Sequence, residues 1–302
     1  MKFSKSKFLE KLKIKYLNSI IIILRMLTTQ IQKSLKKPVR KTPDPNAGII
    51  NFYDIIPKKY IHEVKNPNKD SHNIELPFRM CVVAPSGSGK TNFLMNLIRE
   101  FSKGEGTFID ITIVTSNKDE PLYNWLDENF DMIKVVEGMN NTPNLDDMDK
   151  EENHLVVWDD LVLNKSQDKV EKYYMRARKM NCSVIYLSQS YYDIPKFIRK
   201  NSNYLVILNL GGSKREQTAI LNEWSTDLDK DELNAIYNDA TSEHMRPLII
   251  QGGKVERNMK YRKGWKDYYN LDEFLRNIPR TIVKPKKNKS KKYKNSSDED
   301  SD

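Results

Sequence analysis

The most informative stretch of the chain is a run of small residues that ends in a lysine and a threonine. Its members are Ala84, Pro85, Ser86, Gly87, Ser88, Gly89, Lys90 and Thr91. Because most of these side chains are small or absent, backbone N–H groups can close around phosphate oxygens. We expect Lys90 to reach the β- and γ-phosphates of a nucleotide and the Thr91 hydroxyl to bind Mg²⁺. The run departs from the pattern G-x-x-x-x-G-K-[ST] only at Ala84, where a glycine usually stands.

The residues on either side place this run between a strand and a helix. Met80 to Ala84 is a short apolar segment typical of a buried parallel strand, and alanine is tolerable where such a strand ends. After Thr91, five apolar residues recur at helical spacing: Phe93, Leu94, Leu97, Ile98 and Phe101. Phosphates held by the loop would therefore also meet a helix N-terminus. The stretch is a P-loop, and ATP with Mg²⁺ is the predicted ligand.

A second group of functional residues follows a later apolar strand. Leu155 to Trp158 is apolar and leads directly into Asp159 and Asp160. A parallel strand delivers such acids to the carboxyl edge of the sheet, where the P-loop also lies. We expect Asp159 to hold the Mg²⁺ shell and Asp160 to polarise the attacking water as general base, or to orient it.

Further candidates surround the next strand. Gln189 follows the apolar segment that starts at Cys182, and an uncharged amide there can sense the γ-phosphate or place the water. Phosphoanhydride hydrolysis also needs positive charge in the transition state, which a neighbouring subunit supplies in ring-forming NTPases. Arg176, Arg178 and Arg199 are the candidates, with Arg178 preferred.

The pattern along the chain predicts an α/β fold. Strand-like segments alternate with helical ones from residue 80 to residue 210, which favours a mainly parallel sheet between two layers of helices. Residues 213–242 are helical by pattern, and 247–251 with 255–261 are predicted to form a terminal hairpin. Residues 140–153 are polar and are expected to form a loop or a short exposed helix.

Charge separates the core from its flanks. Residues 1–42 contain twelve lysines and arginines and one acid, and residues 284–302 contain seven lysines and four acids. The remainder therefore carries a net charge of about −4, although the whole chain carries +10. Nucleic-acid binding cannot be argued from the pI of this protein alone.

We accordingly predict four segments. Residues 1–42 form a basic N-terminal arm, 43–75 a proline-rich extended lead-in, 76–279 the P-loop domain, and 280–302 a disordered tail that is first Lys-rich and then acidic. Residues 1–27 resemble a signal peptide only superficially, because Arg25 interrupts the apolar run and no cleavage site follows. A basic amphipathic arm that lies on DNA, a membrane surface or a neighbouring subunit fits better, and a translation start at Met26 is an alternative.

The cysteines and histidines of the chain do not indicate a zinc site. Cys81 and Cys182 both fall in predicted strands, which favours buried reduced thiols over a disulfide. The four histidines show no ligand spacing, so no structural zinc is predicted.

Four motifs together resemble one family. Residues 84–91, Val156 to Asp160, Arg178 to Gln189 and Ile194 to Asn201 stand in the order found in FtsK–HerA-type genome-packaging ATPases of large DNA viruses, virophages and polinton-like viruses. The resemblance covers roughly residues 75–250. Members usually carry Gly-Arg-His at positions 177–179, so Arg178 carries over while Lys179 departs. Asp160 matches the second acid of the family.

The resemblance implies a RecA-like P-loop ATPase that forms a homo-oligomeric ring, expected to be a hexamer, and pumps double-stranded DNA into a preformed capsid. It would act in the host cell at the site of virus assembly, in a cytoplasmic factory or the nucleus, with capsid proteins as partners. The lysine-rich ends would add a salt-sensitive attraction for the phosphate backbone without sequence preference, or serve as solubilising or nuclear-targeting segments. A non-packaging DNA translocase or helicase, and a nucleotide-gated scaffold that binds capsid or membrane, are the alternatives.

Overall fold

A computed structural model describes residues 51–57, 60–61, 64–225 and 227–278. The chain divides into two units, residues 1–63 and 64–302. In the first unit the described residues include one short 3-10 helix, η1 (Phe52–Asp54). The predicted arm (1–42) and the tail from 280 lie outside the described residues. Everything below concerns the second unit.

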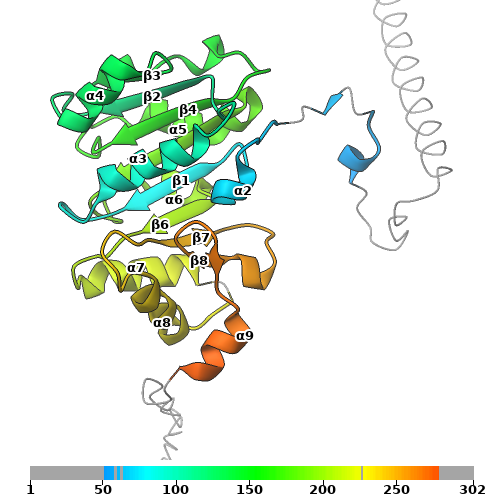
Figure 1. The fold of residues 1–302 in the computed structure, drawn as a ribbon, viewed down its shortest axis with the longest axis vertical. Helices are drawn as coiled ribbons and strands as arrows, with labels where there is room; N and C mark the ends of the chain where they lie inside the picture. Colours follow the sequence, from blue (N-terminus) through cyan, green and yellow to red (C-terminus); the bar gives the residue numbers. More distant parts are fainter. Residues whose placement is uncertain (1–50, 58–59, 62–63, 226, 279–302) are drawn as a thin grey trace, which may run out of the picture. The chain divides into compact units, whose positions relative to one another are not determined.

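A single sheet of nine strands forms the centre of this unit (Figure 1). Its strands are β1 (Arg79–Val83), β2 (Asp110–Thr115), β3 (Ile133–Glu137), β4 (His154–Asp159), β5 (Cys182–Ser188), β6 (Tyr204–Ile207), β7 (Leu248–Gln251), β8 (Tyr261–Lys263) and β9 (Asp267–Tyr268). They follow the order β3-β2-β4-β5-β1-β6-β7-β8-β9, and β1 to β6 are parallel while β7, β8 and β9 join antiparallel. The predicted mainly parallel sheet is confirmed.

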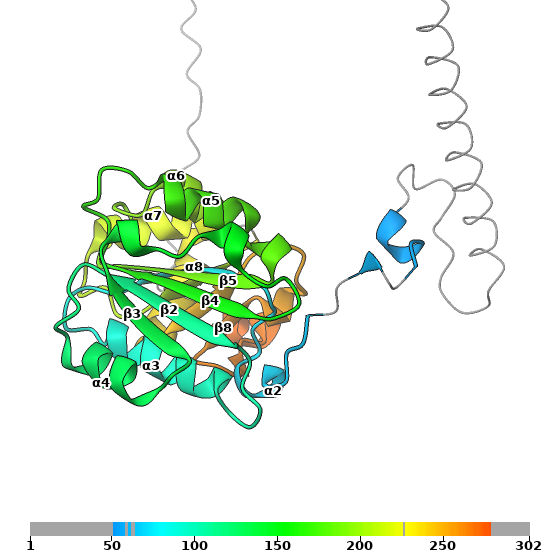
Figure 2. The same cartoon turned by 90° about the horizontal axis from the view of Figure 1, so that it is seen from above.

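Helices cover both faces of the sheet (Figure 2). They are α2 (Lys69–His72), α3 (Lys90–Phe101), α4 (Pro121–Asn129), α5 (Asp168–Arg176), α6 (Lys196–Asn201), α7 (Lys214–Trp224), α8 (Lys230–Ala240) and α9 (Leu271–Phe274). Short 3-10 helices are η3 (Met139–Asn141), η4 (Leu145–Asp147), η5 (Ala177–Met180), η6 (Arg257–Met259) and η7 (Leu275–Asn277). The figure shows α3 and α4 on one face and α5, α6 and α7 on the other.

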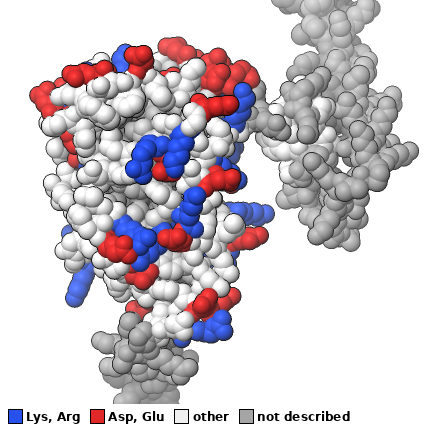
Figure 3. Space-filling view, in the orientation of Figure 1, with Lys and Arg blue, Asp and Glu red and all other residues white. Residues whose placement is uncertain are grey.

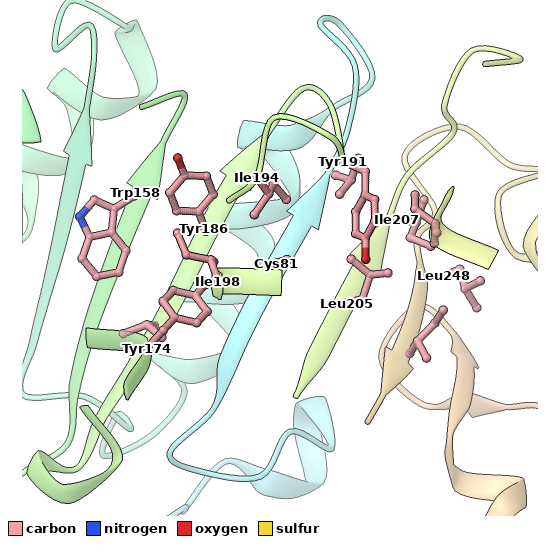
Figure 4. Close-up of a cluster of buried hydrophobic side chains, with 14 of the residues drawn as sticks. Cys81, Trp158, Tyr174, Tyr186, Tyr191, Ile194, Ile198, Leu205, Ile207 and Leu248 are labelled. Carbon is pink, nitrogen blue, oxygen red and sulfur yellow. The ribbon is translucent and has the colours of Figure 1, made fainter. Parts of the chain in front are cut away.

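Alternation along the strands explains the two layers. In β4, Val156 and Trp158 belong to the core beneath α5 and α6, whereas Leu155 and Val157 belong to the core beneath α3 and α4. Successive strand side chains point to opposite faces, so a continuous apolar run fills both cores at once. Figure 4 shows the first of these cores, with Trp158 among its labelled aromatic residues.

Both cysteines lie in central strands, as predicted. Cys81 in β1 and Cys182 in β5 are free and buried. Burial raises the pKa of both thiols, and that of Cys81 reaches about 12. Neither thiol is therefore a nucleophile near neutral pH.

The compact unit begins earlier than the sequence suggested. Residues 64–75 belong to it, although they were predicted to be part of an extended lead-in. Ile74 is fully buried, the ring of His72 packs edge-on against Phe101 at 4.3 Å, and the Asn68 amide donates to the Phe101 carbonyl at 2.9 Å. These contacts fasten the segment to the end of α3.

The C-terminal half agrees with the prediction in its helices and differs from it in one strand. Residues 213–242 form two helices, and α8 begins with a capping box in which the side chain of Asp229 accepts from the Glu232 N–H. The strand expected at 255–261 is wrong, because β8 starts only at Tyr261 and η6 precedes it. Val255, Met259 and Tyr261 share one parity, but Arg257 interrupts them, so the segment offers no continuous apolar face for pairing with β7. No described helix is long and apolar enough to cross a membrane.

Candidate nucleotide site

The predicted P-loop joins β1 to α3 at the carboxyl edge of the sheet. Gly89 is the N-cap of α3 with φ of +96°, and its carbonyl accepts the first helical hydrogen bond, from Phe93 N at 2.8 Å. Gly87 has φ of +75°, a region where a side chain is strained. The first N–H groups of α3 have no intrahelical partner, so they and the helix dipole form a site for an anion.

A cavity of about 300 Å³ lies over this helix end. It is lined by Pro85, Ser86, Gly87, Gly89, Lys90, Thr91, Asn92, Glu120, Leu122, Asp159, Asp160, Gln189 and Met245. Six of the eight predicted loop residues therefore face it. The other two do not, because Ala84 is buried with its N–H bonded to the Ser188 carbonyl at 3.1 Å, and the Ser88 hydroxyl turns back to the Pro85 carbonyl at 2.6 Å.

Strand alternation brings Asp159 to the lysine of the loop. Asp159 has the same parity in β4 as Val157 and so points toward the α3 side of the sheet. Its Oδ1 lies 3.1 Å from Lys90 Nζ, and its Oδ2 accepts a hydrogen bond from the Tyr123 hydroxyl of α4 at 2.6 Å. Burial raises the pKa of the Asp159 carboxyl, while Lys90 and the Tyr123 hydroxyl oppose that shift.

Asp160 lies just beyond the strand, in a left-handed conformation with φ of +52°. Its N–H donates to the Leu187 carbonyl of β5 at 3.3 Å, which fixes the turn. The carboxylate forms an ion pair with Lys90, and its Oδ2 accepts from Gln189 Nε2 at 3.0 Å. One lysine, two acids and one amide, from three separate segments, thus meet in one pocket.

The donor set fits Mg²⁺. This ion prefers oxygen ligands and is usually held by one or two protein side chains together with substrate phosphates and water. Thr91 and Asp159 both line the cavity and supply a hydroxyl and a carboxylate. Asp159 Oδ1 is buried and, apart from its ion pair with Lys90, has no hydrogen-bond partner among the described residues, so this oxygen has capacity for a metal ligand bond.

The three predicted arginines lie in different surroundings. Arg176 forms an ion pair with Asp146 at 2.9 Å, and Arg199 is largely buried, pairs with Glu223 at 3.2 Å and stacks on the Tyr191 ring at 4.7 Å. Arg178 is exposed in η5, with no hydrogen bond or ion pair to any described residue. It precedes β5, so it lies at the amino edge of the sheet, opposite the pocket of its own subunit.

Sequence reasoning missed three residues that shape the site. Tyr123 holds Asp159, Met245 packs on Gly89, and Glu216 of α7 anchors the loop that follows Gln189. Glu216 accepts hydrogen bonds from the Ser190 hydroxyl and, at 3.1 Å, from the Tyr191 N–H. None of the three stands near a recognisable motif, and each acts across a long separation in sequence.

Comparison with known proteins gives this site a family. Residues 68–258 match the family described as Poxvirus A32 protein. The chain belongs to that family. The assignment confirms the resemblance to viral packaging ATPases that the sequence motifs predicted. No curated protein matches the chain.

Several solved structures resemble this member of the A32 family at low identity. The genome packaging NTPase B204 of Sulfolobus turreted icosahedral virus 2, in complex with AMP, is 12% identical with a TM-score of 0.46, over 63% of this chain and 98% of that one. B204 of Sulfolobus turreted icosahedral virus, described as a DNA-packaging ATPase, is 11% identical with a TM-score of 0.44 over the same shares. ATPases 2 and 3 of EssC from Geobacillus thermodenitrificans are 12% identical with a TM-score of 0.42, over 68% and 43%.

Proposed function

We propose that this protein is an ATPase that drives double-stranded DNA into a preformed viral capsid. The observation that carries the ATPase activity is the convergence of Lys90, Asp159, Asp160 and Gln189 on one cavity at a helix N-terminus. Membership of the A32 family supports packaging as the use of that activity. The reaction is hydrolysis of ATP to ADP and phosphate.

Each residue has a defined part in this reaction. The N–H groups at the start of α3 and the Lys90 ammonium bind the β- and γ-phosphates. Thr91 and Asp159 would hold Mg²⁺, which when bound would neutralise charge on these phosphates. Asp160 takes the proton of the attacking water, and the Gln189 amide, which bonds to Asp160, holds that carboxylate and the water in line. Phosphate oxygens compete with Asp160 for Lys90, which leaves the carboxylate a better base.

The Arg178 guanidinium is best placed to act on a neighbouring subunit. Of the three candidate arginines it is the exposed one without a partner among the described residues, and it lies away from the pocket of its own chain. We propose a homo-oligomeric ring, with a hexamer as the simplest arrangement, in which Arg178 reaches the nucleotide bound next door. Transition-state stabilisation of this kind contributes roughly 10³–10⁵ in rate.

Charge supports a division between motor and DNA-binding segments. In Figure 3, Asp and Glu side chains gather over the end of the molecule that carries α4 and β3, a surface that repels a phosphate backbone. The net positive charge of the chain comes from residues 1–42 and 284–302, because the residues between them carry a net charge of about −4. We propose that these segments attract DNA without reading its sequence, and that the protein acts in the infected cell where capsids assemble.

Steady-state ATP turnover with and without double-stranded DNA, across a salt series, tests the proposal. We expect DNA to stimulate turnover and the stimulation to fade as salt rises. Lys90→Ala should abolish turnover, whereas Lys134→Ala, an exposed lysine of β3, should leave it unchanged. Asp160→Asn should still bind ATP but turn it over about 10²–10⁴ times more slowly. Full turnover in Lys90→Ala would refute the site.

Other outcomes would favour the alternatives. Turnover that ignores DNA would favour a nucleotide-gated scaffold over a motor. DNA-stimulated turnover in a protein that never associates with capsid proteins in pull-downs would favour a translocase that works outside a capsid.

Mixed oligomers test the role of Arg178 separately. Arg178→Ala subunits keep an intact pocket and Lys90→Ala subunits keep an intact arginine, so a mixture contains interfaces with both groups. Each variant alone should be inactive, and mixing them should restore part of the turnover. A mixture that stays inactive would exclude Arg178 as the group supplied by the neighbour.

A further inference from the structure

A second, larger hollow of about 610 Å³ lies next to the phosphate pocket. It is bounded by one side of α3, by the loop before β7 and by the turn between β8 and β9. Both segments lie at the carboxyl edge of the sheet, because Leu248 pairs with Ile207 at the end of β6 and with Lys263 at the end of β8. Asn92 and Met245 line both cavities, so the hollow continues directly from the place where phosphates bind.

We propose that this hollow binds the base and ribose of the nucleotide. The inference rests on the proposed function, since it extends the same site from the phosphates to the nucleoside. A nucleoside triphosphate whose phosphates lie at the start of α3 has its ribose and base within reach of the adjoining cavity. A volume of this size is within the range that small ligands occupy in proteins.

Charge in the hollow argues against a second phosphate site. Three of its four basic side chains are paired with acids. Arg246 lies 2.6 Å from Glu243, Lys263 lies 3.6 Å from Asp239, and Lys103 pairs with the buried Glu100. The fourth, Lys266, is exposed. With its cations largely neutralised, the hollow suits an uncharged ligand group better than an anion.

The remaining lining has the chemistry of a base platform. Trp265 stacks on Phe93 of α3, with ring centroids 5.2 Å apart and planes at 30°, which fixes the indole at the wall. Met245 also lines the hollow and leaves 43% of its surface exposed, and a Cβ on Gly89 would lie only 2.7 Å from Met245 Cγ. Aromatic rings and a thioether provide apolar, polarizable surface, on which the flat face of a base packs well.

Polar groups at the rim can read the edge of the base. The Asn92 side chain is exposed and makes no hydrogen bond to a described residue. A side-chain amide can accept from the amino group of adenine and donate to its ring nitrogen. His244 is exposed, lines the same hollow and adds a second planar group. The preferred ligand would therefore be an adenine nucleotide, with its base stacked on Trp265 and hydrogen-bonded to the Asn92 amide.

The experiment compares two ligands that share the phosphates and differ in the nucleoside. Binding of ATP and of inorganic tripolyphosphate, each with Mg²⁺, is measured calorimetrically on the full chain. We expect Trp265→Ala to weaken ATP binding about five- to hundredfold, the range for loss of a base–aromatic stack, and to leave tripolyphosphate binding within about twofold. Trp265→Phe should recover most of the loss. Trp125→Ala, which removes an exposed tryptophan of α4, is the matched control.

A second variant guards against a folding defect in Trp265→Ala. His244→Ala changes an exposed side chain and should weaken ATP binding about fivefold without affecting tripolyphosphate. ATP binding that stays within twofold of wild type in both variants would overturn the inference. So would a parallel loss of both ligands, since Trp265 would then act through Phe93 on the phosphate site. If the wild-type protein binds neither ligand, the proposed function itself fails.

Discussion

Tyr123→Phe tests how the site holds Asp159, the carboxylate proposed to bind Mg²⁺. The hydroxyl of Tyr123 donates to Asp159 Oδ2 at 2.6 Å, inside a site where both side chains are almost fully buried. Burial and the adjacent carboxylate raise the pKa of Tyr123, so the hydroxyl keeps its proton and remains a donor. Phenylalanine fills the same volume and removes only that hydrogen bond.

The size of the effect follows from the charge of the acceptor. A hydrogen bond to a charged group contributes about 1.5–3 kcal/mol, and an outer partner of a metal ligand typically accounts for about 10–100-fold in metal affinity. Without its donor, Asp159 also favours the protonated form more strongly, because burial already raises the pKa of this carboxyl. We expect the Mg²⁺ concentration for half-maximal ATP turnover to rise about 10–100-fold.

The assay is ATP turnover titrated with Mg²⁺ at constant free ATP. Tyr173→Phe is the matched control, since the Tyr173 hydroxyl donates to the Pro143 carbonyl at 2.9 Å far from the pocket. The control should lose stability without a change in Mg²⁺ dependence. An unchanged Mg²⁺ titration in Tyr123→Phe would show that the hydroxyl does not organise Asp159, and the argument for its positioning role would be refuted.

Three further perturbations are informative. Glu216→Ala removes the carboxylate that accepts hydrogen bonds from Ser190 and Tyr191, and it should lower kcat about 5–30-fold with little change in KM for ATP. Glu216→Gln keeps an acceptor and should keep most of the activity. Equal losses of kcat in both variants would contradict a role for these hydrogen bonds. Hydrogen bonds to Asp110 and Asp149 raise the pKa of His154. The stabilisation of the folded state by the protonated ring is therefore complete at low pH and is lost as pH rises through that pKa. In urea unfolding, His154→Phe should accordingly lower the free energy of unfolding more at pH 6 than at pH 9. Burial lowers the pKa of His72 to about 4, so the folded state loses about 2–3 kcal/mol of stability as pH falls from 7 to 4.5. His72→Asn keeps an acceptor for the Ile74 N–H but cannot take up this proton. In urea unfolding, the variant should therefore lose less free energy of unfolding than the wild type over the same pH range.

Local sequence predicted the parts of the site that lie on regular elements. The P-loop lies between β1 and α3 as expected, because a short apolar run and a 3.6-residue repeat leave few alternatives. The acids follow β4 for the same reason, and strand alternation alone sends Asp159 toward Lys90. Gln189 was also expected beside this pair, and its amide bonds to Asp160.

The contacts that escaped prediction depend on tertiary packing. Tyr123 meets Asp159 only because α4 packs beside the end of β4, and Met245 reaches Gly89 from a loop more than 150 residues away. Arg199 has the residue type of a catalytic arginine, but its pairing with Glu223 is visible only in the fold. The strand expected at residue 255 fails for a different reason, since Val255 is the only β-branched residue of the segment before Tyr261 and Arg257 interrupts the apolar face that pairing with β7 would need.

Hydrogen bonds in the structure connect the nucleotide pocket to α7, and they offer a route by which a change at the nucleotide could be transmitted to that helix. Gln189 bonds to Asp160, and the next residues are fastened to α7, where Glu216 holds Ser190 and Glu223 holds the Tyr191 hydroxyl. A shift of Gln189 when the γ-phosphate departs would therefore pull on a helix rather than on a free loop. Because Arg199 and Trp224 also contact Tyr191, the pull would reach α6 and the end of α7 together. Such a linkage would convert a change of hydrogen bonds at one phosphate into movement of a helical layer, as the proposed motor function requires.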